Sequence, residues 1–319
     1  MYRRRLLTIP IAFLSAISLI MLSPLLFLIA FAASIAPGLR ALPQALAFML
    51  GYLYFECVGL LRLFWVWVRW RNSSAYPKAN REIQAWWISN LLAMGQNIFK
   101  LTISVSGTHA IQGPSALVIA RHTSLADTAL PMVFFALARR ESLRYVLKQE
   151  LTVVPCLDVC GHRLPNVFVD RSGQDTAGQK AALGALISTA GPDESVLIYP
   201  EGTRYSRERH QNLEQSSPAL APQLQRWPDL LPPRLGGVLA LLEMNPGKDV
   251  VCLCHTGLEG SATLRDLIDG SWQSRRVRIH FWRIPFAEIP ADLNQFINSQ
   301  WDLMQAHIRQ LRQLDEIDY

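Results

Sequence analysis

Residues 116–127 read ALVIARHTSLAD, an apolar run of five residues followed directly by a polar segment. The run 116–120 has the length and composition of a buried strand, and apolar residues recur at helical spacing from about 125 to 140. A strand that turns into a helix is the repeating unit of sheets covered by helices. The polar turn holds His122 and Asp127 at the end of this strand.

The same alternation of short strands and longer helical patterns continues along the chain. Further strands are expected at 101–106, 143–147, 167–169, 196–199, 250–254 and 276–282. Further helices are expected at 81–100, 174–190, 233–244 and 292–314. This pattern predicts an α/β fold with a mostly parallel sheet flanked by helices. Residues 205–232, polar and then rich in proline and leucine, are expected to form a long loop near the site.

The first 72 residues are expected to form a membrane anchor. No charge interrupts positions 6–39, a run longer than the roughly 20 residues that one membrane-spanning helix needs. The second apolar segment, 41–68, holds only two charged residues, Glu56 and Arg62. The two segments predict a helical hairpin, spanning or re-entrant, that precedes a catalytic domain at residues 73–319.

The basic residues of the hairpin indicate its orientation. Arg3, Arg4 and Arg5 precede it, and Arg69 and Arg71 follow it. Because cytoplasmic flanks are enriched in Lys and Arg, both ends are expected on the cytoplasmic side of the inner membrane. A cleaved signal peptide is disfavoured, because its apolar core would be too long and a second apolar segment follows at once.

Charge and cysteine content narrow the classes of partner. The chain carries a formal net charge of +6, but residues 1–80 hold eight Lys/Arg against one acid, whereas residues 81–319 are close to neutral. A basic excess confined to the anchor favours anionic lipid over nucleic acid as the partner. The five cysteines lack the paired spacing of a metal site, so reduced, packed thiols and no metal are expected.

His122 and Asp127 form a candidate acid–base pair. A carboxylate that accepts the N–H of one ring nitrogen leaves the other nitrogen free to act as a base. A substrate hydroxyl can then be the nucleophile, without a nucleophilic side chain. The alternative is a structural histidine beside an aspartate that caps a helix.

Two further polar motifs end predicted strands. Residues 199–204 read YPEGTR, in which Gly202 allows close approach of a ligand to the backbone, Thr203 offers a hydroxyl and Arg204 a guanidinium suited to phosphate. Residues 168–171 read FVDR, and Arg171 ends its strand. Ligands of open α/β sheets bind at such strand ends. The alternatives are a solvated basic loop and a surface ion pair between Asp170 and Arg171.

Together these motifs resemble the PlsC-like glycerolipid acyltransferase family, which contains the bacterial 1-acylglycerol-3-phosphate O-acyltransferases. The resemblance lies in the order and spacing of HX4D, FVxR and PEGTR over residues 80–285. The stretch LLPPR at 230–234 is similar to the branch that contains the YihG-type enzymes and the lysocardiolipin acyltransferases. Two positions depart from the family pattern: Arg121 stands where Asn is common, and His255 ends a segment that usually ends in proline.

The resemblance implies a role for each motif residue. His122 would deprotonate the hydroxyl of a lysophospholipid and Asp127 would orient His122. The acceptor would be held by Ser124, Arg171, Glu201, Gly202, Thr203 and Arg204. The acyl donor would be acyl-CoA or acyl carrier protein, as a co-substrate and not a cofactor. No catalytic role is expected for His255.

Three other functions are considered beside acyl transfer to 1-acylglycerol-3-phosphate. A lipase is disfavoured because the chain has no G-x-S-x-G nucleophile elbow. A remodelling acyltransferase or transacylase acting on another headgroup would use the same pair, His122 and Asp127. A non-catalytic membrane adaptor is disfavoured because every charged motif residue is present.

Overall fold

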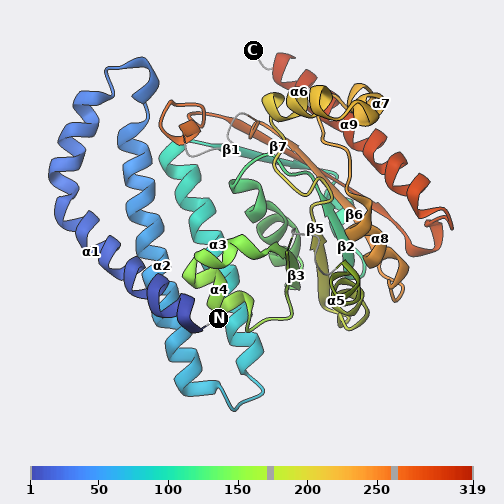
Figure 1. Ribbon diagram of the computed structural model, residues 1–319, viewed down its shortest axis with the longest axis horizontal. Coiled ribbons are helices and arrows are strands. Elements are labelled where there is room, and N and C mark those ends of the chain that lie inside the picture. Colours follow the sequence, from blue (N-terminus) through green and yellow to red (C-terminus); the bar gives the residue numbers. More distant parts are fainter. Residues whose placement is uncertain (1, 171–175, 260–264, 318–319) are drawn as a thin grey trace. The chain divides into compact units, whose positions relative to one another are not determined.

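The computed structural model describes residues 2–170, 176–259 and 265–317 (Figure 1). Its internal contacts divide the chain into two compact units. The first unit comprises Met1–Leu101, Leu147–Asp170 and Leu264–Ser274. The second unit comprises Thr102–Val146, Arg171–Thr263 and Arg275–Tyr319. The sequence predicts a different boundary, between a membrane anchor at residues 1–72 and a catalytic domain at residues 73–319. That boundary stays a prediction.

Two long apolar helices begin the first unit. Helix α1 (Tyr2–Ala33) packs against α2 (Leu42–Trp70), and the 3-10 turn η1 (Pro37–Leu39) lies between them. Helix α1 continues through Pro10 and Pro24. Both helices are long and apolar enough to cross a membrane.

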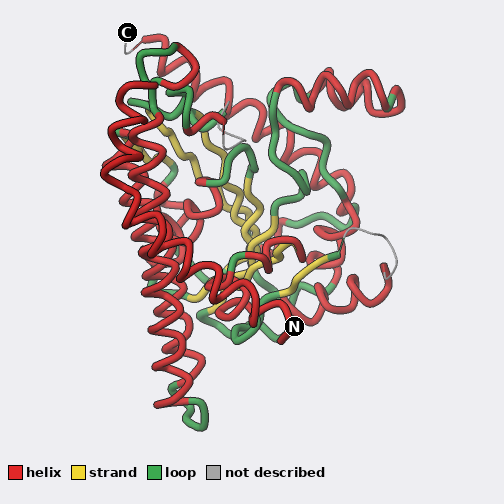
Figure 2. The backbone as a smooth tube through the Cα atoms, turned by 60° about the vertical axis from the view of Figure 1, so that its left-hand side comes forward, coloured by secondary structure: helices red, strands yellow, loops and turns green. Residues whose placement is uncertain are grey.

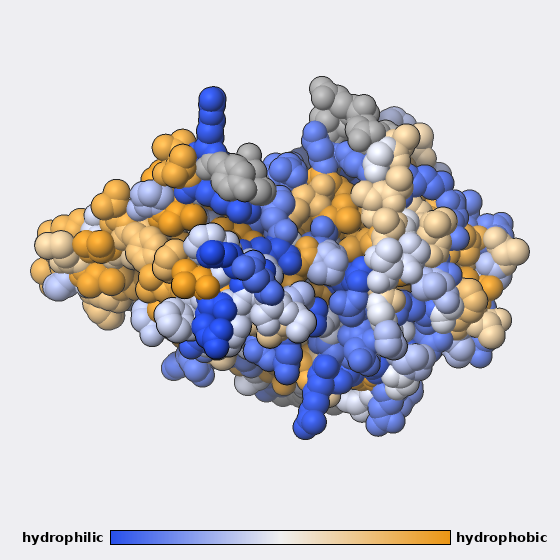
Figure 3. Space-filling view, turned by 90° about the horizontal axis from the view of Figure 1, so that it is seen from below, coloured by the Kyte–Doolittle hydropathy of each residue, from blue (hydrophilic) through white to orange (hydrophobic). Residues whose placement is uncertain are grey.

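Many apolar side chains of these helices are exposed, Met21 and Leu28 of α1 among them. Figure 3 shows this surface as the orange area at the left. A large exposed apolar surface is unusual on a water-soluble protein, so it favours association with a membrane.

Polar contacts connect both apolar helices to α4 (Pro155–Gly161) within the first unit. Arg4 and Arg5 of α1 form ion pairs of 2.6 and 2.8 Å with Asp158, whose side chain is fully buried. Burial opposes the charge of Asp158, but the hydrogen bonds and charges of Arg5 and Arg4 outweigh it and lower the pKa of the carboxyl. On α2, Glu56 accepts a hydrogen bond of 2.6 Å from the backbone N–H of Cys156, so this acid faces protein.

Two further helices of the first unit pack on this helical pair. Helix α3 (Tyr76–Phe99) lies against α2, and α4 contacts α1, α2 and α3. The short strand β4 (Val167–Val169) belongs to the same unit.

The second unit is built on a mostly parallel sheet, as the alternating sequence pattern predicts. Its strands lie in the order β1-β7-β6-β2-β5-β3, and Figure 2 shows them in yellow. Their bounds are Thr102–Ser106 for β1, Ala116–Ala120 for β2, Ser142–Lys148 for β3, Glu194–Ile198 for β5, Asp249–Thr256 for β6 and Arg276–Ile284 for β7. The pair β6 and β7 is antiparallel, and the other pairs with a defined register are parallel.

Helical segments cover both faces of this sheet. Successive side chains of a strand point to opposite faces. Trp282 of β7 donates a hydrogen bond of 2.9 Å to Gln300 of α9 (Leu293–Ile317), which therefore covers one face. Phe281, the residue before Trp282, points to the opposite face and stacks on Phe135 of the π-helical segment η4 (Met132–Leu137). This segment therefore covers the second face of the sheet. Helices α5 (Thr176–Ser188) and α8 (Leu235–Glu243) pack on each other.

One sequence-based expectation is wrong, and another is met by a different type of helix. Residues 205–232 contain helices α6 (Arg207–Ser216) and α7 (Ala221–Arg226), although the sequence pattern predicts a loop. The Ser206 side chain caps α6 by accepting a hydrogen bond from the N–H of Arg209. The helical stretch expected at 125–140 is present, as the 3-10 turn η3 (Ala126–Ala129) followed by the π-helical segment η4.

The prediction that the cysteines are packed thiols agrees with the structure. All five cysteines are free thiols, and four of them are buried. Within residues 2–170, 176–259 and 265–317, no cluster of three or more His, Cys, Asp or Glu side chains is arranged to hold a metal ion.

Candidate active site

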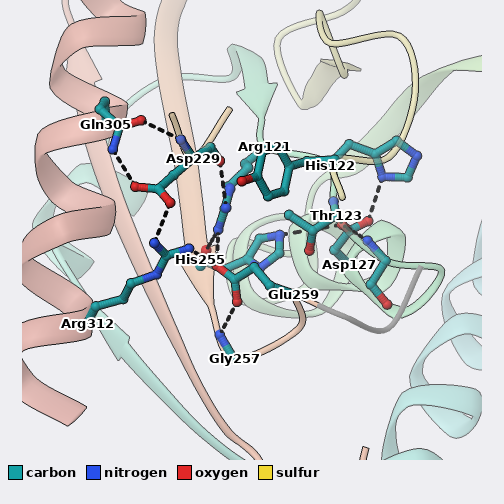
Figure 4. A network of polar contacts seen from close by, with 12 residues as sticks. Arg121, His122, Thr123, Asp127, Asp229, His255, Gly257, Glu259, Gln305 and Arg312 are labelled. Carbon is teal, nitrogen blue, oxygen red and sulfur yellow. Dashed lines mark hydrogen bonds and ion pairs between the residues drawn. The ribbon is translucent and has the colours of Figure 1, made fainter. Parts of the chain in front are cut away.

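The structure brings His122 and Asp127 into direct contact at the end of β2. The Nδ1 atom of His122 lies 2.9 Å from Oδ1 of Asp127 (Figure 4). Both residues are buried, with His122 8% and Asp127 1% exposed. The polar turn after β2 folds back into η3, and this reversal allows two residues five positions apart to meet.

The second oxygen of Asp127 is held by the backbone of the same turn. Oδ2 accepts hydrogen bonds from the N–H groups of Thr123, at 2.5 Å, and Ser124, at 2.7 Å. Burial opposes ionisation of Asp127, but the charge and hydrogen bond of His122 and the nearby His255 outweigh it. The pKa of Asp127 is therefore lowered and the carboxylate is charged at neutral pH.

Glu201, which follows β5, supports the backbone around His122. Its Oε1 accepts the N–H of His122 at 2.8 Å, and its Oε2 accepts the N–H of Leu231 at 3.0 Å. Burial raises the pKa of Glu201 to about 7, although both of these hydrogen bonds oppose the shift. Since protein N–H groups occupy both oxygens, Glu201 shapes the site through the backbone that it holds.

Two further contacts fix the histidine. The N–H of Tyr205 donates to the carbonyl of His122 at 2.7 Å. The ring of Tyr199 lies 4.8 Å from the His122 ring, between centroids, and its hydroxyl donates to the carbonyl of Asp127 at 3.4 Å. No sequence pattern assigns Tyr199 this role, because its place beside the imidazole depends on the distance between β2 and β5.

Arg121 points away from His122 and into a network of ion pairs, drawn in Figure 4. Its Nη1 lies 2.6 Å from Glu259 and also donates to the carbonyl of His255. Its Nη2 donates to the carbonyl of Asp229 at 2.8 Å. Arg312 of α9 pairs with both Asp229 and Glu259. Because Arg121 is fully buried and bonded to protein, it is a structural member of the site.

The expected acceptor residues lie at the ends of the same strands. Gly202 has a φ of 69°, in the left-handed region that favours glycine. The hydroxyl of Thr203 accepts a hydrogen bond from Arg209 of α6. Arg204 is partly exposed and forms no hydrogen bond or ion pair with another described residue. Ser124 is buried and its hydroxyl accepts the N–H of Ala126 at 3.1 Å.

Arg171, the remaining residue expected to bind the acceptor, lies outside the described residues. The strand that precedes it is β4, as expected.

His255, for which the sequence predicts no catalytic role, lies beside the pair in the structure. Its Nε2 lies 3.5 Å from Oδ2 of Asp127, and the side chain is fully buried. His255 comes close to Asp127 because β6 pairs with β2. A local sequence pattern does not show which strands are paired.

The arrangement is suited to general-base catalysis. Nδ1 of His122 faces a charged carboxylate, which favours the tautomer with the proton on Nδ1. Nε2 of His122, which has no hydrogen-bond partner among the described residues, is then free to accept a proton from a hydroxyl.

Comparison with known proteins gives two findings. Residues 102–234 match the family model described as Acyltransferase. The chain is also similar in fold to the crystal structure of the 1-acyl-sn-glycerophosphate (LPA) acyltransferase PlsC from Thermotoga maritima. That likeness has a TM-score of 0.54 and 18% sequence identity, and it covers 85% of this chain and 96% of the other. The matched segment contains His122, Asp127 and the whole PEGTR motif. Residues 102–234 therefore form an acyltransferase domain, and the chain is similar in fold to the Thermotoga maritima protein.

Proposed function

We propose that this protein transfers an acyl chain from an acyl thioester to the free hydroxyl of a lysophospholipid. The acceptor proposed first is 1-acylglycerol-3-phosphate, which would yield phosphatidic acid. The observation that carries the proposal is the contact of 2.9 Å between His122 and the charged Asp127 at the end of β2, inside the matched domain. The choice of acceptor is supported by the likeness in fold to the Thermotoga maritima protein, a 1-acyl-sn-glycerophosphate acyltransferase.

The proposed reaction needs one base and no nucleophilic side chain. Nε2 of His122 takes the proton of the acceptor hydroxyl while the oxygen attacks the carbonyl carbon of the thioester. The tetrahedral intermediate collapses by breaking the C–S bond, and the thiolate leaves with the proton held by His122. Asp127 keeps the ring in its tautomer and stabilises the imidazolium that forms. A base of this kind contributes about 10²–10⁴-fold to the rate.

The acceptor phosphate is assigned to the PEGTR loop. Arg204 is the guanidinium of this loop that no described residue neutralises, and Gly202 exposes backbone at a left-handed turn. Thr203 adds a hydroxyl, and Arg171 is retained as a further phosphate ligand from the family resemblance. A guanidinium forms two parallel hydrogen bonds with phosphate, which gives orientation as well as affinity.

The apolar helices support a membrane location. We propose that α1 and α2 hold the enzyme at the inner membrane with the catalytic domain facing the cytoplasm. Lysophospholipids reside in the bilayer, whereas acyl-CoA and acyl carrier protein are water-soluble. An enzyme attached to the cytoplasmic leaflet has access to both substrates.

A second headgroup class is also a candidate. The LLPPR stretch, which resembles the branch of lysocardiolipin and YihG-type enzymes, contacts the catalytic loops directly. The N–H of Leu231 donates to Glu201 and the N–H of Arg234 donates to the carbonyl of Pro200 at 2.8 Å. Because this stretch adjoins the PEGTR loop, lysophosphatidylglycerol or lysocardiolipin is the alternative acceptor.

The test uses membranes that contain the full-length protein, a labelled acyl-CoA or acyl carrier protein, and a panel of lysophospholipids. Transfer to lysophosphatidic acid above all other acceptors is the expected result, with His122→Ala membranes at background. Preferred transfer to lysophosphatidylglycerol or lysocardiolipin would select the alternative headgroup. If no acceptor is acylated from either donor by folded protein, the proposed function is wrong.

A further inference from the structure

His255 is a buried polar side chain that the proposed reaction does not yet use. It is fully buried, and neither ring nitrogen has a hydrogen-bond partner among the described residues. Buried polar groups are nearly always hydrogen-bonded, so an exception calls for a physical reason. The polar group that faces this ring is Asp127, whose Oδ2 lies 3.5 Å from Nε2.

The strand register explains why His255 reaches Asp127. Strands β2 and β6 are parallel, with Ala120 opposite Leu253, so continuing the register by two residues sets His122 level with His255. In the antiparallel pair of β6 with β7, His255 lies opposite Ile279. Ile279 shares the face of Phe281, which η4 covers, and Asp127 lies in η3 just before η4. Both histidines therefore point to the face on which Asp127 lies (Figure 4).

The backbone of His255 is held in place by Arg121. The Nη1 of Arg121 donates to the carbonyl of His255 and pairs with Glu259. Arg121 and His255 are the two positions at which the sequence departs from the family pattern, and the structure shows that they are bonded to each other. The arginine therefore fixes the strand end that carries the second histidine.

We propose that His255 is a positioning residue for acyl transfer, with its Nε2–H directed at Oδ2 of Asp127. Two histidines then face one carboxylate: His122 at Oδ1 as the base and His255 at Oδ2 as a support. The separation of 3.5 Å is longer than a hydrogen bond, and such contacts in active sites often shorten once substrate is bound. The inference rests on the proposed function, because it assigns His122 as the base that Asp127 orients.

The first test compares three variants in the full-length protein. His255→Leu removes the donor and keeps an apolar side chain, whereas His255→Gln retains an N–H near the position of Nε2. Thr256→Val is the matched control, because Thr256 is the next residue of β6, is similarly buried and has a hydroxyl without a partner among the described residues. We expect His255→Leu to lower kcat by about tenfold or more with KM nearly unchanged, as for other supporting contacts in active sites. His255→Gln should recover much of this loss, and Thr256→Val should match the wild type.

A double-mutant cycle separates positioning from general stability. If His255 acts through Asp127, His255→Leu has no further effect on kcat in an Asp127→Asn background. Equal fold-losses of kcat in both backgrounds, or no loss in the wild-type background, would overturn the proposal.

An NMR measurement that needs no enzyme activity tests the role of His255 separately from the proposed acyl transfer. In protein labelled with ¹⁵N-histidine, the nitrogen shifts of His255 report which ring nitrogen carries the proton, and His255→Gln assigns the signal. We expect the proton on Nε2, and a proton on Nδ1 alone would overturn the inference. Absence of acyl transfer by the wild type would count against the proposed function, while the labelled spectrum would still decide the orientation of His255.

Discussion

Replacing Asp127 with asparagine changes one oxygen for an NH2 group and leaves the volume of the side chain nearly unchanged. In the native site Oδ2 accepts two backbone N–H groups and Oδ1 faces Nδ1 of His122. The amide must keep its oxygen toward the two N–H groups, because the opposite orientation would leave buried donors unsatisfied at about 1–3 kcal/mol each. The NH2 group then faces His122, so Nδ1 becomes an acceptor and the proton moves to Nε2.

A histidine in that tautomer cannot deprotonate the acceptor. The corresponding substitution in a serine protease triad lowers kcat by about 10⁴-fold. We expect a loss of about 10³–10⁴-fold here, which corresponds to about 4–5.5 kcal/mol in the activation free energy. KM for both substrates should change little, since the substituted side chain is buried behind the histidine.

The assay is steady-state acyl transfer by purified protein in detergent or vesicles, over a range of acceptor and donor concentrations. Circular dichroism and thermal unfolding confirm that the variant is folded. A loss in kcat of less than about tenfold in folded Asp127→Asn would refute the tautomer argument, because a wrong tautomer removes the base altogether.

Three further predictions concern other described contacts. Arg204→Ala should raise KM for the acceptor by about 10–100-fold with little change in KM for the donor, since a charge-assisted contact is worth about 1.5–3 kcal/mol. Arg207→Ala, which changes an exposed arginine nearby, is the control. Equal losses for both substrates would contradict the assignment. Burial raises the pKa of Glu201 to about 7, above the ordinary value of 4.5, so the stability contributed by its neutral form is complete below about pH 4.5 and is lost as the pH rises through 7. We therefore measure the melting temperature of the wild type minus that of Glu201→Gln, and expect this difference to be lower at pH 8 than at about pH 5. A difference that does not change with pH would show that Glu201 is ionised throughout. Asp158→Asn should lower stability by about 1–3 kcal/mol, because two arginines of α1 lose a charged partner; an unchanged denaturation midpoint would show that this ion pair contributes nothing.

The central strands β2, β5 and β6 were predictable because they are buried on both faces. Segments such as 116–120 and 250–254 are continuous apolar runs, which strands in a helix-covered parallel sheet require. Helices α6 and α7 were missed because they are short and mostly polar, so they present no apolar stripe at helical spacing. The segment after Asp127 does have such a stripe, but it folds as a 3-10 turn and a π-helical segment.

The contact between His122 and Asp127 was predictable because the two residues are close in sequence and belong to one turn. The contacts of Glu201 with His122 and Leu231 connect residues that are distant in sequence, as does the contact of His255 with Asp127. Such contacts depend on which strands are neighbours, and an isolated motif does not carry that information. The ion pairs of Asp158 in the first unit show the same limit, because Arg4 and Arg5 are far from Asp158 in the sequence.

His122 is assigned here as the base of an acyltransferase. The most direct test of this role is the rate of transfer from labelled acyl-CoA to lysophosphatidic acid by wild type, His122→Ala and His109→Ala, where His109 is an exposed histidine of the second unit. We expect His122→Ala to lose at least about 10²-fold in kcat while folding normally, and His109→Ala to keep the wild-type rate. Undiminished transfer by folded His122→Ala would contradict the assignment.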